Sequence, residues 1–265
     1  MNAALFSDPL LKVAIMAALE AGRKIMEIYA DDDYGVELKG DASPLTLADK
    51  AAHEVIMQAL RQTGLPVLSE EGQEISYAER SVWERFWMVD PLDGTKEFIS
   101  RNGEFTVNIA LIEQGCPVLG AVYVPVIDEL YIGQEGKGAL LIRAAASEAC
   151  AAVSLPYGGG AEADGVYRVV CSRSHLNEET LAFIEGLRTE HPEIEIVQRG
   201  SSLKICMVAA GDADTYPRFG PTMEWDTAAG HAVVRAAGKR LVVAGSGDEV
   251  QYNKENLLNP SFVVQ

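Results

Sequence analysis

The sequence predicts an α/β fold whose N-terminal part is of the α+β kind. Two observations carry this prediction. Predicted strands and helices alternate through the second half of the chain, as they do where helices cover a sheet. In the first half, the apolar run 86–89 is typical of a buried strand, and it ends in Asp90 and Asp93. Acids at this position point to the carboxyl end of a strand, where open α/β sheets place their ligands.

The composition is that of a folded globular protein with an excess of acid. Of the 265 residues, 48% are hydrophobic and 23% are charged, and this length allows one large domain or two smaller ones. A net charge of −17 argues against a nucleic-acid polymer as partner, because its phosphate backbone would be repelled. A small phosphorylated ligand would therefore require metal ions or a local basic patch.

Membrane-spanning and zinc-thiolate proteins are not indicated. No apolar run approaches the ~18 residues that a membrane-spanning helix needs. The N-terminal segment carries an early acid, Asp8, and lacks the basic region of a signal peptide. The cysteines are far apart and match no zinc spacing, so we expect them to be reduced. We expect a cytoplasmic protein without a transmembrane segment, and peripheral association with the inner membrane stays open.

The N-terminal segment predicts two helices and a short strand. The first helix begins at Asp8-Pro9, where an acid can cap the end and proline fits the first turn. The second covers 46–62, and Thr46 with Asp49 matches a capping box in which Asp replaces the usual Glu. A structural role for Asp49 therefore stands beside any functional one. A strand at 66–68 leads directly into Glu70 and Glu71.

The remaining elements divide at a stretch with little periodic signal. Gly133, Gly136 and Gly138 lack the Gly-x-Gly-x-x-Gly pattern and the helix that should follow it, so a hairpin is favoured over a phosphate loop. The small-residue stretch 144–152 places a domain boundary between residues 1–146 and 147–265. Before the boundary, strands are expected at 105–112, 118–124 and 127–132. After it, strands are expected at 167–171, 194–197, around 215 and at 240–244, and helices at 177–188, 202–210 and 225–237.

The stretch from Asp90 to Thr95 has two possible explanations. Two carboxylates three residues apart in a tight turn repel each other unless a cation lies between them. Oxygen ligands of this kind suit Mg²⁺ or Mn²⁺ rather than zinc. However, Asp, Pro and Gly are also common in ordinary surface turns. On this stretch alone, metal binding and a plain turn stay open.

Acidic residues recur at the ends of other predicted elements. Asp226, taken alone, is typical of a helix N-cap. Together, Asp49, Glu70, Asp90/Asp93 and Asp226 form an ordered pattern that chance produces less readily. The Asp-Pro-Leu-Asp-Gly-Thr turn, the upstream Glu-Glu and the downstream Trp-Asp resemble the lithium-sensitive, magnesium-dependent phosphatase superfamily that includes inositol monophosphatase and fructose-1,6-bisphosphatase. This resemblance spans about 49–238 and implies a layered αβαβα sandwich of the inositol monophosphatase type.

Within that superfamily, three longer stretches resemble the bacterial 3′(2′),5′-bisphosphate nucleotidases of the CysQ type. The stretches are 92–105, 200–204 and 216–226. Inositol monophosphatases more often continue the first motif with Thr-Asn-Phe, whereas this chain has Lys96-Glu97-Phe98. The resemblance therefore favours the nucleotidase branch, with the nucleotide bisphosphate as a small-molecule partner and a monomer or homodimer as the assembly.

The resemblance also implies roles for individual residues. The metal ligands would be the carboxylates of Glu70, Asp90, Asp93 and Asp226 with the Leu92 carbonyl, holding two or three Mg²⁺ ions. Asp49 and Thr95 would orient and deprotonate the attacking water. Substrate contacts would come from Glu70, Leu92, Asp93, Gly94, Thr95, His175, Ser201, Lys204, Arg218 and Asp226. Of these, His175, Ser201, Lys204 and Arg218 would face the nucleoside monophosphate. A solvated helix position for Lys204 and a loop cap for His175 stay open as alternatives.

The implied reaction is hydrolysis of the 3′-phosphate of 3′-phosphoadenosine 5′-phosphate to AMP and phosphate, with the sulfated nucleotide as a second candidate substrate. The alternative on the same metal core is an inositol or sugar monophosphatase. A hypothesis of another class is a binding protein that kept the fold after losing activity, against which the intact acids and Thr95 argue.

Overall fold

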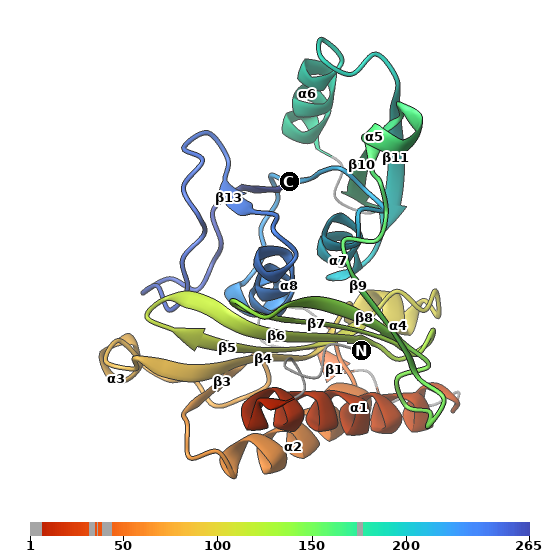
Figure 1. The fold of residues 1–265 in the computed structure, drawn as a ribbon. Coiled ribbons are helices and arrows are strands. Elements are labelled where there is room, and N and C mark those ends of the chain that lie inside the picture. The colour runs from red at the N-terminus through yellow and green to blue at the C-terminus, as the bar shows by residue number, and fades with distance from the viewer. Residues whose placement is uncertain (1–6, 32–34, 36, 39–43, 174–176) are drawn as a thin grey trace.

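Two capped amphipathic helices form the first layer of the protein, whose computed structural model describes residues 7–31, 35, 37–38, 44–173 and 177–265. In α1 (Pro9–Tyr29), Asp8 caps the N-terminus by accepting from two first-turn amides at 2.8 and 3.3 Å. The second helix, α2 (Leu47–Arg61), begins after Thr46 in the predicted capping box. Both helices lie along one face of the large sheet (Figure 1).

The second layer is a seven-stranded sheet in the order β3-β4-β5-β6-β7-β8-β9. β3 runs parallel to β4, and the other neighbouring pairs are antiparallel. The strands are β3 (Val67–Ser69), β4 (Arg85–Asp93), β5 (Thr106–Glu113), β6 (Cys116–Val124), β7 (Glu129–Gln134), β8 (Gly138–Arg143) and β9 (Ala151–Leu155). The short helices α3 (Tyr77–Arg80) and α4 (Thr95–Ile99) precede and follow β4 in the chain.

Side chains of β4 alternate between two hydrophobic cores. Trp87 and Val89 belong to the core shared with the first helical layer, and Phe86 and Met88 belong to the core on the opposite face. Because both faces are covered, the strand is a continuous apolar run rather than an alternating one. This is the pattern that marked 86–89 as a buried strand.

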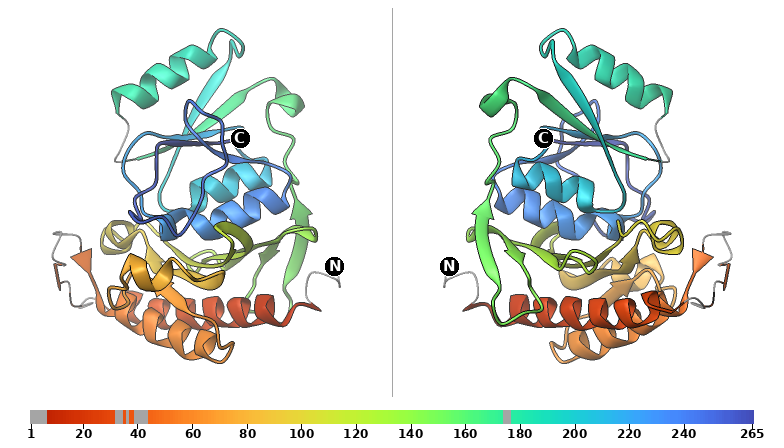
Figure 2. Two further views of the ribbon diagram at one scale, coloured as in Figure 1. Left: turned by 90° about the vertical axis from the view of Figure 1, so that its left-hand side faces the viewer. Right: turned by 90° about the vertical axis from the view of Figure 1, so that its right-hand side faces the viewer.

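The third layer consists of α7 (Leu203–Ala210) and α8 (Glu224–Ala236), which lie over the second face of the sheet (Figure 2). Glycines in the sheet allow α8 to approach closely. A Cβ at Gly120 would lie 2.2 Å from the Ala229 oxygen, and one at Gly133 would lie 2.6 Å from the Val233 Cα. The middle of α8 is thereby seated on the sheet, and its first turn carries Asp226.

Smaller sheets form the fourth layer and short helices the fifth. One sheet has the order β12-β14-β13, and the other pairs β10 with β11 in parallel. A bridge between Val169 and Thr215 connects the two. The elements are β10 (Tyr167–Ser172), β11 (Ile194–Arg199), β12 (Tyr216–Arg218), β13 (Leu241–Val243), β14 (Phe262–Val264), α5 (Ala161–Asp164) and α6 (Glu178–Leu187); a separate strand pair is β1 (Glu37–Leu38) with β2 (Pro44–Leu45).

The layered αβαβα sandwich that the family resemblance implied is confirmed, and the α/β class that the alternating elements predicted is confirmed with it. One expectation needs correction: β4 does not end at Val89 but continues to Asp93. Some short elements were not predicted, namely the strands β1, β2, β9 and β14 and the helices α3, α4 and α5. β9 and β14 are short. β9 pairs with the preceding strand β8 but lies in a small-residue stretch with little periodic signal, whereas β14 owes its pairing to β12 and β13, which lie well before it in the chain.

The predicted boundary between 1–146 and 147–265 stays a prediction. β9 lies beyond that point in the chain, yet it pairs with β8 and completes the first sheet. No helix in the described part of the chain combines the length and apolar character that crossing a membrane requires.

Candidate active site

The acidic turn is built into β4 rather than following it. Asp90 pairs with Asn108 and Asp93 pairs with Thr106 on β5, and the register shifts between these two pairs. The Leu92 amide donates to Asp90 Oδ1 at 3.1 Å, which closes the turn locally. This irregularity carries two acids three residues apart at the end of one buried strand.

A glycine and a threonine begin the next helix. Gly94 has a φ of 94°, a left-handed conformation that glycine adopts without strain, and it precedes α4. Thr95, the first residue of α4, donates its hydroxyl to Asp49 Oδ1 at 3.2 Å. The turn therefore brings the chain next to the N-terminus of α2.

Asp49 serves two partners at once. Its Oδ2 accepts from the Thr46 amide at 2.7 Å and from the Thr46 hydroxyl at 2.6 Å, while Oδ1 faces Thr95. The predicted capping box is confirmed. Since capping occupies one oxygen, the contact with Thr95 does not compete with it.

Asp226 occupies the equivalent position on α8. Asp226 was predicted to be the N-cap of this helix. It is instead the third residue of the helix, and the N-cap is Met223. The Met223 amide donates to Asp226 Oδ2 at 2.8 Å. An acid at this helix position reaches back to the free amide in front of the helix, as in a capping box. The N-cap prediction was wrong by three residues, because sequence alone fixes the boundary of an element only to about two to four residues.

A backbone hydrogen bond between neighbouring strands brings Glu70 close to Asp90. Its amide donates to the Val89 oxygen at 3.1 Å, one residue before Asp90. Burial raises the pKa of Asp90 well above its usual value, and the carboxylates of Glu70, Asp93 and Asp226 raise it further. Burial likewise raises the pKa of Asp226, together with Asp93 and Glu70, against the opposing effects of the Met223 amide and Arg218.

The oxygen donors at this site suit a hard divalent cation, although they do not form a complete coordination shell. Within the described ranges, no three His, Cys, Asp or Glu side chains already meet as a metal-binding group. The acids are therefore electrostatic neighbours without forming a closed coordination shell. Carboxylate and carbonyl oxygens are what Mg²⁺ prefers, and a cation would relieve the repulsion that raises the pKa values of Asp90 and Asp226. The residues present fit such an ion.

A cavity of about 120 Å³ opens beside these acids. Five of the predicted substrate contacts line it: Asp93, Ser201, Lys204, Arg218 and Asp226. Glu70 instead lines a second cavity, of about 440 Å³. Leu92 is buried, Thr95 contacts Asp49, and Gly94 lies against Ser201. His175 lies outside the described residues.

Two buried cations face the first cavity. Lys204, 5% exposed, donates to the Ser201 oxygen at 2.6 Å and lies 5.4 Å from the Tyr216 ring centroid. It is not the solvated helix residue that stayed open as an alternative. Arg218 donates to the Pro221 oxygen at 2.9 Å, and its Nε has no hydrogen-bond partner among the described residues. The pair supplies the local basic patch that a phosphorylated ligand of this acidic chain would need.

Burial lowers the pKa of Lys204 to about 8, and the nearby Arg218 lowers it as well. The carboxylates of Asp93, Glu97 and Glu104 act in the opposite direction. The side chain is therefore cationic below this pH and loses its charge above it.

Several residues that build the site were not predicted. Ser202, Thr106 and Asn108 surround Asp93, and Tyr216 lies under Lys204. Ser202 stands in the Gly-Ser-Ser run that was singled out, so a signal existed for it. Thr106 and Asn108 lie in an otherwise apolar strand. Because they are two residues apart, they lie on the same face of that strand, and this could have indicated a polar partner.

The fold and these acids together define a family. A model of the inositol monophosphatase family matches residues 7–262. The chain belongs to the inositol monophosphatase family. The resemblance seen in the sequence is thereby confirmed.

Among its relatives, the chain is similar to bacterial nucleotidases. It is 47% identical over 260 residues to the 3′(2′),5′-bisphosphate nucleotidase CysQ of Salmonella typhimurium, covering 96% of this chain and 99% of the relative. It is 48% identical over 251 residues to that of Escherichia coli K12, covering 93% and 96%. The crystal structure of CysQ from Bacteroides thetaiotaomicron, a bacterial member of the inositol monophosphatase family, matches with a TM-score of 0.89 and 48% identity over 98% of both chains.

Proposed function

We propose that the protein is a Mg²⁺-dependent 3′(2′),5′-bisphosphate nucleotidase that hydrolyses 3′-phosphoadenosine 5′-phosphate to AMP and phosphate. The observation that carries the proposal is the buried pair Lys204 and Arg218, which shares a cavity with Asp93 and Asp226. A substrate with two phosphates uses both halves of that cavity: the acids, with Mg²⁺, for the reacting group and the cations for the other. The similarity to CysQ proteins over nearly the whole chain supports the same substrate class.

Mg²⁺ would be held by Glu70, Asp90, Asp93, Asp226 and the Leu92 carbonyl. When bound, it supplies charge stabilisation to the phosphoryl group and lowers the pKa of a water. We propose that two or three Mg²⁺ ions bind at this site.

The protein's own groups then position and deprotonate the nucleophile. The Thr95 hydroxyl donates a hydrogen bond to Asp49, so the lone pairs of its oxygen are left to accept a hydrogen bond from water. We assign Asp49 as the acceptor of the water proton, held in place by Thr46. The water oxygen attacks the 3′-phosphorus in line, the bond to the ribose 3′-oxygen breaks with its electron pair going to that oxygen, and the oxygen takes up a proton from solvent water to leave as a hydroxyl.

At the other end of the cavity, Arg218 and Lys204 would contact the 5′-phosphate, with Arg218 offering a planar fork of donors. The sulfated nucleotide, which carries the same 3′-phosphate, is the second candidate substrate. The four cysteines are free, which fits the cytoplasm as the proposed location. The assembly is proposed to be a monomer or a homodimer.

A phosphate-release assay on a panel of substrates tests the function. With Mg²⁺, we expect 3′-phosphoadenosine 5′-phosphate to be hydrolysed well ahead of inositol 1-phosphate, with loss of activity in chelator and inhibition by Li⁺. A clear preference for the inositol ester would instead establish the alternative, an inositol or sugar monophosphatase. Tight nucleotide binding without turnover would indicate a non-catalytic binding protein.

Arg218→Ala is expected to lower kcat/KM for the bisphosphate by about 10- to 100-fold, because a charge-assisted hydrogen bond contributes ~1.5–3 kcal/mol. The effect should appear mainly in KM. Adenosine 3′-phosphate, which lacks the 5′-group, provides the matched comparison, and its kinetics should change little. An equal loss on both substrates, or no loss on either, would contradict the proposed contact.

The pKa of Lys204, lowered by burial to about 8, predicts a pH dependence. In the free enzyme, kcat/KM for the bisphosphate should fall as pH rises through this value, because the neutral amine no longer attracts the 5′-phosphate. Below it, the cation is present and this effect is absent. Steady-state kinetics from pH 6 to about 10 would test this, with Lys204→Arg expected to remove the alkaline decline. A decline that persists unchanged in Lys204→Arg would assign it to another group.

A further inference from the structure

Ser201 has a backbone conformation that serine rarely adopts. Its φ is 52°, in the left-handed region, although it is not glycine. Residues of this kind persist where their surroundings over-determine them, and they cluster at functional sites. Ser201 lies between Gly200 and Ser202, immediately before α7, where both the acids and the buried cations are within reach.

This conformation directs two groups at one carboxylate oxygen. The Ser201 hydroxyl donates to Asp93 Oδ2 at 2.8 Å, and the Ser202 amide donates to the same oxygen at 2.7 Å. Since the Ser201 proton points to Asp93, the Thr106 hydroxyl 2.6 Å away donates to Ser201. Among the described residues, the donors to the Asp93 side chain, which come from Asn108, Ser201 and Ser202, all reach Oδ2, and Thr106 lies 3.5 Å from the same oxygen. The segment therefore fixes one oxygen and leaves Oδ1 for another partner.

Ser202 connects the same carboxylate to a second acid's backbone. Its hydroxyl lies 2.9 Å from Asp93 Oδ2 and 2.7 Å from the Asp226 carbonyl oxygen, and it is shared between them. The side chain is 2% exposed, so water does not compete for these bonds. The positions of Asp93 and of the start of α8 are thereby tied together.

The same turn holds the cation on its other side. The Ser201 carbonyl oxygen accepts from Lys204 Nζ at 2.6 Å. A shift of Ser201 thus moves an acid contact through its side chain and a cation contact through its carbonyl. The two halves of the cavity share one residue.

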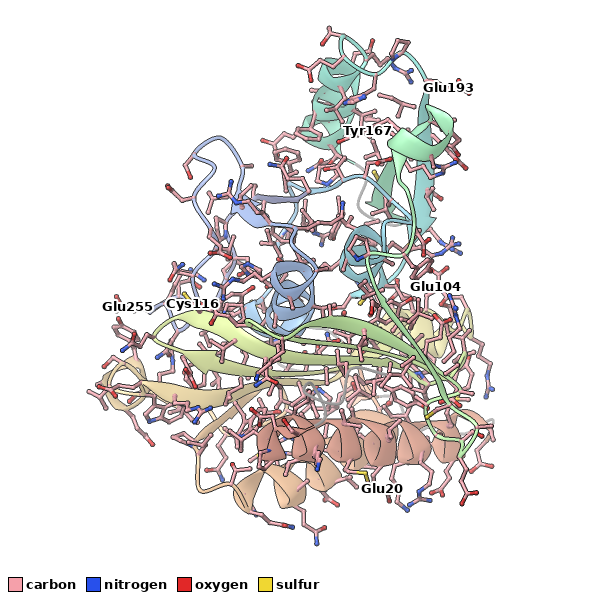
Figure 3. The ribbon with its side chains drawn as sticks, viewed as in Figure 1. Glu20, Glu104, Cys116, Tyr167, Glu193 and Glu255 are labelled. Carbon is pink, nitrogen blue, oxygen red and sulfur yellow. The ribbon has the colours of Figure 1, made fainter. Side chains whose placement is uncertain are left out.

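The start of the segment is clamped to the chain that follows α4. The Gly200 amide donates to Glu104 Oε2 at 2.8 Å, and Arg173 pairs with Glu104 Oε1 at 2.9 Å. A Cβ on Gly200 would lie 2.8 Å from Glu97 Cγ and 2.9 Å from the Glu104 oxygen, so only glycine fits. Figure 3 labels Glu104 where the large sheet meets the layers above it. The segment has little freedom to adjust independently of the acids.

We propose that the segment from Gly200 to Lys204 is a positioning device that couples the divalent-cation site to the subsite for the nucleotide 5′-phosphate. Ser201 is its central positioning residue, acting through Asp93 on one side and Lys204 on the other. The proposal rests on the proposed function for the identity of the two ligands. It assigns Ser201 a role other than the direct substrate contact that the family resemblance implies.

Binding measurements on Ser201 variants test this without relying on turnover. Mg²⁺ is titrated by calorimetry in the absence of nucleotide, and AMP is titrated with Mg²⁺ present. We expect Ser201→Ala to weaken both affinities by about ten-fold. The hydrogen bond to charged Asp93 is lost directly, and without it the turn shifts and moves the Ser201 carbonyl that holds Lys204. Ser81→Ala, an exposed serine on α3's C-terminal side, is the matched control and should change neither.

A second variant separates the hydrogen bond from the backbone conformation. Ser201→Gly also lacks the hydroxyl, but glycine adopts a positive φ without strain. It should lose as much Mg²⁺ and AMP affinity as Ser201→Ala while melting at a higher temperature. If Ser201→Gly melts at the same temperature as Ser201→Ala and keeps full affinity for Mg²⁺ and AMP, the role of the hydroxyl is overturned.

Two other outcomes would overturn the coupling. If only AMP binding weakens while Mg²⁺ affinity is unchanged, Ser201 is a direct nucleotide contact. If only the melting temperature falls, its role is structural. Failure of the unaltered protein to bind AMP would count against the nucleotide function instead, and the Mg²⁺ titration would still decide whether Ser201 acts through Asp93.

Discussion

Asp90→Asn is expected to remove nearly all turnover while stabilising the metal-free protein. A cation clamp on the phosphoryl group contributes several kcal/mol, so kcat should fall by at least about 10³-fold. Asparagine keeps the Oδ1 that accepts from Leu92 but carries no charge. Because burial and neighbouring carboxylates raise the pKa of Asp90, its ionised form destabilises the fold at neutral pH, and the substitution removes that penalty.

The two halves of this prediction are measured separately. Phosphate release is followed in Mg²⁺, and the melting temperature is measured in chelator, where it should rise by a few degrees for each ~1 kcal/mol recovered. In the unaltered metal-free protein, stability should decrease as pH rises from the ordinary carboxyl pKa through the raised one. Asp248→Asn, an exposed acid outside the site, should leave both quantities unchanged. A lower melting temperature for Asp90→Asn would show that the carboxylate is not destabilised.

Asp49→Asn is expected to lower kcat by about 10²- to 10⁴-fold, the usual contribution of a general base. KM and the calorimetric Mg²⁺ affinity should change little, because Asp49 is assigned to the water and not to the metal. A modest loss of stability, about 1 kcal/mol, should accompany it, since asparagine replaces one of the oxygens that cap α2 and face Thr95.

Combining this change with Thr95→Ala gives a sharper test. The Thr95 hydroxyl is hydrogen-bonded to Asp49, and both are assigned to one water, so removing either should disable the pair. The double variant should then be only as slow as the slower single variant. Multiplicative losses would mean that the two residues act independently. Thr95→Ser, which keeps the hydroxyl, should retain most of the activity.

The roles of Asp49 and Asp226 show how far local sequence reasoning extends. Both acids stand near a helix start, where capping alone explains an aspartate. Each proves to be the third residue of its helix and uses Oδ2 to accept a backbone amide. Capping by one oxygen fixes the direction of the other, so the structural and functional explanations do not exclude each other. No local pattern could reveal this, because the partner of Asp49 lies 46 residues away in Thr95.

Lys204 marks the limit of the sequence in another way. In sequence it is an ordinary lysine near a helix start, and a solvated position was a fair alternative. Its burial depends on Tyr216 and on the turn at Ser201, which bring β12 and α7 together. The depressed pKa follows from that packing and not from its neighbours along the chain.

The sequence by itself determined the layered architecture, the helix starts at Asp8 and Thr46, and the family to which the acidic motifs belong. These depend on periodicity, capping and short motifs, whose physical causes lie within a few residues of one another. Only the tertiary structure decided that β4 continues through its acids to Asp93, and that Ser201 and Ser202 hold one oxygen of that residue. Such arrangements depend on long-range contacts, where burial and shared hydrogen bonds outweigh local preference.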